Sequence, residues 1–130
     1  MSDRGDLAGA EPLLRENLAT SARVLGADHP NVAAAQASLA GVLLAKGDAA
    51  EAEALYRESL ALKRKVFGDA HSEYAIALNN LANALELLGR FDEARPLFEQ
   101  ALQIARPLLG DQHLTVVTMM LNCARMEVLR

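Results

Sequence analysis

The sequence predicts an all-α protein built as a solenoid of stacked antiparallel helix pairs. One observation is a turn motif that recurs every 42 residues without a gap: GADH at 26–29, GDAH at 68–71 and GDQH at 110–113. Another is that apolar positions keep the same interval, as Leu18, Leu60 and Leu102 do. A fixed period of about 20 to 50 residues is typical of repeat proteins, because each repeat buries its apolar face only against its neighbours.

The first two helices are expected at about 7–25 and 30–46. Apolar residues of the first follow helical spacing after the turn at Gly5-Asp6. Asp28 or His29 can cap the second, and Pro30 suits its first position. The second helix is apolar on more than one face, so it should lie between neighbours.

Four further helices are expected, separated by glycine turns. The third starts at Gly47-Asp48 and ends at Gly68, and the others cover about 72–88, 91–108 and 113–130. Pro12 and Pro96 should lie near the first turn of their helices, where a missing N–H costs little, whereas Pro107 should end or bend its helix early.

With A for the first and B for the second helix of each pair, the six helices follow the order B-A-B-A-B-A. The chain is then one repeat domain, 1–130, made of a half repeat at 5–26, full repeats at 29–68 and 71–110, and a half repeat at 113–130. Short connections make successive helices antiparallel neighbours.

Composition narrows the function classes. The 130 residues are 52% hydrophobic and 23% charged, with a formal net charge of −4. A nucleic-acid binder needs a basic stripe, and the run Lys63-Arg64-Lys65 is explained by its place near a helix end. Cys123 is the single cysteine, and neither a signal peptide nor a membrane-length apolar stretch is present in the sequence. We expect a cytoplasmic protein that binds neither nucleic acid nor membrane.

The motif residues resemble the tetratricopeptide repeat (TPR) family, in the 42-residue variety of kinesin light chains and many bacterial proteins. In the second full repeat they are Asn80-Leu81-Ala82, Ala84, Leu85, Gly89-Arg90-Phe91, Glu93-Ala94, Phe98 and Ala101-Leu102. In the first they are Leu39-Ala40, Gly47-Asp48, Glu51-Ala52, Tyr56 and Leu60. The resemblance implies a right-handed superhelix whose A helices line a concave groove that holds a peptide or helix of a partner protein.

Burying Leu81, Ala82 and Leu85 leaves a set of residues of the central A helix facing the groove that the resemblance implies. The candidate peptide-binding residues are Ile76, Asn79, Asn80, Asn83, Glu86 and Leu87, with Ser38, Asn122 and Arg125 from the flanking A helices. Asparagine amides can donate to and accept from an extended backbone. Two alternatives stay open: the asparagines are simply solvated, and the small residues around Ser38 serve helix packing without a pocket.

The sequence contains no candidate set of catalytic or metal-binding residues, so we expect no enzyme activity, cofactor or metal. His29, His71 and His113 belong to the same turn in successive repeats, about two interaxial distances of 8 to 10 Å apart, too far to share one zinc ion. Cys123 takes the place of a buried leucine and should be an inert core residue.

The terminal helices each lack a pair partner, and the last one is rich in apolar residues. Met119, Met126 and Leu129 are the candidate self-association residues. Three explanations stay open: the chain is a fragment of a longer repeat array, it forms a homo-oligomer, or the last helix is an exposed cap. We favour the first two over the third.

Overall fold

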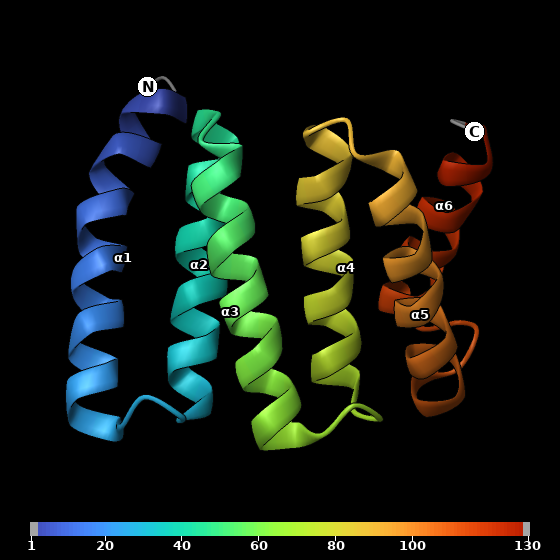
Figure 1. The fold of residues 1–130 in the computed structure, drawn as a ribbon, viewed down its shortest axis with the longest axis horizontal. Coiled ribbons are helices and arrows are strands. Elements are labelled where there is room, and N and C mark those ends of the chain that lie inside the picture. Colours follow the sequence, from blue (N-terminus) through green and yellow to red (C-terminus); the bar gives the residue numbers. More distant parts are fainter. Residues whose placement is uncertain (1–2, 129–130) are drawn as a thin grey trace. The chain divides into compact units, whose positions relative to one another are not determined.

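A computed structural model describes residues 3–128, and within them it contains six α-helices and no strand (Figure 1). They are α1 (Asp3–Leu25), α2 (Pro30–Lys46), α3 (Ala49–Phe67), α4 (Ser72–Leu87), α5 (Phe91–Leu109) and α6 (Leu114–Val128). Side chains are described from residue 9 onward. The predicted all-α class and helix order are confirmed. The division into full and half repeats remains a prediction. None of the described helices is both long and apolar enough to span a membrane.

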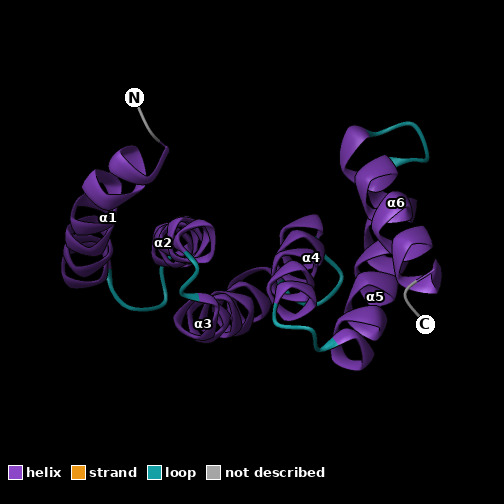
Figure 2. Ribbon diagram, turned by 90° about the horizontal axis from the view of Figure 1, so that it is seen from above, coloured by secondary structure: helices purple, strands orange, loops and turns teal. Residues whose placement is uncertain are grey.

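The chain divides into two compact units, which we call unit 1 (residues 1–66) and unit 2 (residues 67–130). In unit 1, α1 packs beside α2, and in unit 2, α5 packs against both α4 and α6 (Figure 2).

The histidines of the repeated turns cap the A helices. Nδ1 of His29 accepts a hydrogen bond from the backbone N–H of Asn31 at 3.1 Å. His71 does the same for Glu73 at 3.0 Å, and His113 for Thr115 at 3.1 Å. An imidazole acceptor satisfies one of the N–H groups that a helix start leaves unpaired. The proposed capping role of this turn is therefore confirmed.

Two helix boundaries differ from the prediction. Gly5-Asp6 lies inside α1 instead of before it, since a glycine lowers helix stability by about 1 kcal/mol without ending the helix. Pro12 therefore lies in the helix interior and not near the first turn. α5 continues past Pro107 to Leu109, because a proline so close to the helix end removes little of the hydrogen-bond ladder. Gly110, with φ 88°, ends the helix instead.

The cores use small residues at the helix crossings, as predicted. Ala40 and Ala52 of unit 1, and Ala82 and Ala94 of unit 2, are fully buried. In unit 1 the buried Ser59 hydroxyl of α3 donates to the backbone carbonyl of Ala33 on α2 at 2.8 Å. This hydrogen bond shows which side of an A helix faces the B helix of its own pair.

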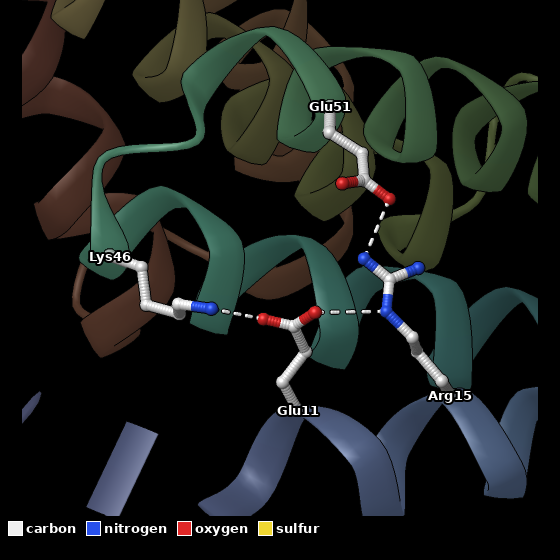
Figure 3. A network of polar contacts seen from close by, with 4 residues as sticks. All are labelled: Glu11, Arg15, Lys46 and Glu51. Carbon is white, nitrogen blue, oxygen red and sulfur yellow. Dashed lines mark hydrogen bonds and ion pairs between the residues drawn. The ribbon is translucent and has the colours of Figure 1, made fainter. Parts of the chain in front are cut away.

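An ionic network ties α1 to the turn between α2 and α3 (Figure 3). The Glu11 carboxylate accepts from Arg15 Nε at 3.0 Å and from Lys46 Nζ, and Arg15 Nη2 donates to Glu51 at 2.9 Å. The hydrogen bond from Lys46, followed by that from Arg15, lowers the pKa of Glu11. The network holds α1 against the end of α2 and the start of α3, at the solvent-exposed edge of the contact between these helices.

Candidate peptide-binding surface

The central A helix, α4, has the rotation about its axis that the sequence predicts. Leu81, Ala82 and Leu85 are buried. The predicted groove residues lie on the less buried sides: Ile76, Asn79, Asn80, Asn83 and Glu86 are half-buried, and Leu87 is exposed. Their half-burial leaves part of each side chain accessible for a ligand.

Two asparagines join α4 to α6. Asn122 Nδ2 donates to Asn79 Oδ1 at 3.0 Å. Asn122 is only 7% exposed, so it is a buried packing residue and not the open groove residue that the sequence predicted. Asn122 takes the repeat position of the half-buried Asn80, and its hydrogen bond to Asn79 places it in the contact between two neighbouring A helices.

A bidentate ion pair joins the same two helices. Arg125 donates through Nε to Glu86 Oε2 at 2.7 Å and through Nη2 to Oε1 at 2.6 Å. The guanidinium carbon of Arg125 also lies 5.9 Å from the centre of the Phe98 ring. The hydrogen bond to Glu86 raises the pKa of Arg125, which keeps the side chain charged. The two predicted groove charges therefore neutralise each other.

A cleft of about 240 Å³ opens between α4 and α6, within unit 2. Its lining residues are Ile76, Asn79, Leu114, Thr115, Thr118 and Met119. Ile76 and Leu114 supply apolar surface above the buried Met119, while Asn79 and the threonines supply an amide and two hydroxyls. Sequence reasoning placed Ile76 and Asn79 here. It missed Thr115, although Thr115 and Met119 lie four positions apart, a spacing that puts them on one helix face.

Ser38, the predicted groove residue of unit 1, is exposed and lines a different cleft, also of about 240 Å³. This cleft lies between α1 and α2, and its other lining residues are Asn17, Ser21, Asn31, Ala34 and Ala35. A Cβ at Gly41 would lie 3.6 Å from the Tyr56 hydroxyl, an ordinary van der Waals distance, so this contact does not require glycine. The small residues of α2 divide between the cleft, with Ala34 and Ser38, and the core, with Ala33 and Ala40.

The predicted self-association residues are mostly buried. Met119 and Met126 are 1% and 0% exposed, which corrects their assignment to an open face, and Leu129 lies outside the described residues. The exposed apolar residues of α6 are instead Leu114, Val117, Met120, Leu121 and Val128. The two methionines take the positions of Ala77 and Ala84 of α4, which are also buried.

Cys123 is half-buried, less than the buried leucines Leu39 and Leu81 at its repeat position. Burial, followed by the carboxylates of Glu99 and Glu127, raises the pKa of its thiol. A raised pKa keeps the less reactive thiol form at neutral pH.

Comparison with known proteins identifies the family. A tetratricopeptide repeat model matches residues 2–65, 32–106 and 73–130, so the chain belongs to the TPR family. TPR domains are in general protein-interaction modules on a scaffold that is not usually catalytic. No curated protein sequence matches the chain.

Among solved structures, the chain is similar to TPR proteins of the kinesin-light-chain type. A kinesin-light-chain-type protein of Podosopora anserina with nearly identical TPR-like repeats is 29% identical, with a TM-score of 0.86 over 94% of this chain and 58% of that one. BtubC of P. vanneervenii is 22% identical, with a TM-score of 0.84 over 94% of this chain and 49% of that one, and it shares the fold. The chain spans about half the length of these proteins.

Proposed function

We propose that the chain binds an extended peptide or a helix of a partner protein along its A helices, without catalysing a reaction. The observation that carries this proposal is the cleft between α4 and α6, where apolar surface lies beside the Asn79 amide and the Thr115 and Thr118 hydroxyls. Such a combination suits a ligand that inserts an aliphatic side chain and hydrogen-bonds through its backbone.

The electrostatics indicate what kind of peptide fits. Glu86 and Arg125 neutralise each other beside the cleft. A peptide segment without charged side chains would enter without competing for either group, whereas an acidic peptide would have to displace Glu86 from Arg125. Asn80, Asn83 and Leu87 extend the proposed surface along α4. In unit 1, Ser38 takes the repeat position of Asn80 and lines a separate cleft.

A phage-displayed library of short random peptides, selected on the immobilised chain, tests the proposal. Selected peptides should bind the wild type and lose at least about tenfold in affinity to Thr118→Arg, which places a long cation in the cleft. Gln100→Arg on the exposed surface of α5 is the matched control and should bind like the wild type. Failure to select any peptide, or equal binding to Thr118→Arg, would refute the groove assignment.

A second candidate function is self-association through the terminal helices, or continuation of this repeat array in a longer chain. The observation that favours it is the row of exposed apolar residues on α6, including Leu121 and Val128. Single exposed apolar residues are ordinary, but a contiguous helix face is typical of an interface.

A further inference from the structure

Because the chain repeats every 42 residues, the exposure of each α6 residue can be compared with that of its counterpart in α4. Three of its residues are exposed although their counterparts 42 residues earlier in α4 are buried. Val117, Met120 and Ala124 correspond to Ala75, Leu78 and Ala82. Val117 and Met120 are each 37% exposed, against 0% and 1% for their counterparts.

Unit 1 shows what normally covers this side of an A helix. The residue of α2 equivalent to Val117 is Ala33, whose carbonyl accepts from Ser59 of α3 at 2.8 Å. The equivalent of Met120 is Gln36, whose Nε2 lies 3.5 Å from the Glu58 carboxylate, also on α3. The open side of α6 is therefore the side on which a B helix packs.

The open side of α1 is the matching half of such a pair. Ala10 and Leu14 are only half-buried and Asn17 is exposed, whereas their counterparts on α5, Ala94, Phe98 and Ala101, are fully buried. Asn17 is the equivalent of Ser59, the residue that donates to the A helix in unit 1. Thus α1 is a B helix whose A-helix side is open within the described residues.

We infer that the occupant of both faces is a second copy of this chain, with α1 of one molecule packed on α6 of the next. The register is that of α3 on α2. Asn17 then donates to the carbonyl of Val117, as Ser59 does to that of Ala33, and Ala10 crosses Ala124, as Ala52 crosses Ala40. The contact continues the helix pairing already present within each unit, so it needs no new type of packing.

The same register also covers the other exposed side of α6. In unit 2, α6 lies beside α4 through Asn122–Asn79 and Arg125–Glu86. The equivalent pairs between two molecules are Ser38–Leu121 and Gly41–Val128. Leu121 and Val128 are 63% and 84% exposed, and they would meet the small residues of the second molecule's α2. Large side chains opposite small ones make this contact apolar and complementary in size.

Asn17, Ser21 and Ser38 line the cleft of unit 1 where this incoming helix would lie. The pairing residues named above are uncharged, so no like charges oppose each other. Glu127, however, takes the position of the buried Leu43 and Leu85. The contact should therefore be weaker than an internal helix pair, and association should require high protein concentration.

This inference rests on the self-association candidate and is independent of peptide binding in the cleft between α4 and α6, whereas a peptide and a second molecule would compete for Ser38. Because the two faces differ, the contact is heterologous, and it adds molecules head to tail without forming a closed two-fold dimer. The average mass should then rise with concentration beyond that of a dimer.

Sedimentation velocity on the 130-residue chain and two blocked variants tests the arrangement. Asn17→Arg blocks α1 and leaves α6 open, whereas Ala124→Arg blocks α6 and leaves α1 open. Each variant alone should stay monomeric, and an equimolar mixture should form dimers and nothing larger. Gln100→Arg, with the same added charge on α5, should associate like the wild type.

Thermal unfolding monitored by circular dichroism should match the wild type for both variants, since both replaced residues are exposed. If Ala124→Arg is destabilised, Val117→Arg blocks the same face. A wild type that stays monomeric at high concentration would overturn the inference. So would dimers of Asn17→Arg alone, because they would indicate a two-fold contact through α6.

Discussion

The two units use polar side chains in different places. In unit 1 the ion pairs of Glu11, Arg15, Lys46 and Glu51 lie near solvent, at the rim between α1 and the turn from α2 to α3 (Figure 3). In unit 2 the asparagine pair and the Glu86–Arg125 pair lie between two A helices, and Asn122 is buried. The side chains of Arg125 and Glu86 are 42% and 17% exposed, about as open as Arg15 and Glu11 at 44% and 20%, so water and salt screen both ion pairs. The difference is the buried Asn122 amide, which fixes how α6 faces α4. The second arrangement therefore determines the shape of the candidate binding cleft.

Removing the asparagine contact should have the largest effect on stability. Asn79→Ala leaves the buried Asn122 amide without its acceptor, and we expect the free energy of unfolding to fall by about 1–3 kcal/mol in urea denaturation. Asn80→Ala, at the adjacent half-buried position, is the control and should lower the free energy of unfolding clearly less. An equal loss of unfolding free energy in the two variants would show that the Asn79–Asn122 hydrogen bond does not hold the helices together.

Breaking the ion pair of unit 2 should lower stability less than Asn79→Ala does, but it should change which peptides bind. Glu86→Gln should lower the free energy of unfolding by about 1 kcal/mol or less, because Arg125 is partly open to solvent. The freed Arg125 should then raise the affinity for peptides with an acidic residue, measured by fluorescence anisotropy against the same peptides with glutamine. Arg125→Gln should remove that gain, and a gain that survives this change would assign it to another residue.

The rim network of unit 1 should give the smallest effect, and one that depends on salt and pH. Lys46→Gln removes the main cause of the lowered pKa of Glu11. Because the folded-state pKa of Glu11 lies below the usual glutamate value of 4.5, its ion pairs stabilise the fold above that pH, and this stability is lost as the pH falls through the folded-state pKa. The difference in unfolding free energy between wild type and Lys46→Gln should thus be present at neutral pH and disappear in acid or in high salt. A difference that is independent of both would indicate lost packing of the lysine stem.

The sequence was sufficient for the features that depend on the period and on local chemistry. The interval of 42 residues located the helices, the histidine turns located the caps, and the alanines marked the close crossings. The burial of Met119 and Met126 follows from the same period, because they take the positions of the buried Ala77 and Ala84 of α4. They were placed on the open side from the apolar content of the last helix alone. The pairing of Glu86 with Arg125 and of Asn79 with Asn122 could not be predicted from the period, because each pair joins two separate helices.

Amide chemical-shift mapping by NMR with a library-selected peptide tests the central claim most directly. If the cleft of unit 2 is the binding surface, the largest perturbations should fall on Ile76, Asn79, Thr115 and Thr118, and the α1–α2 cleft with Asn17 and Ser21 should change little. Perturbations centred on Asn17 and Ser21, or spread over the exposed face of α5, would contradict the assignment of peptide binding to the contact between α4 and α6.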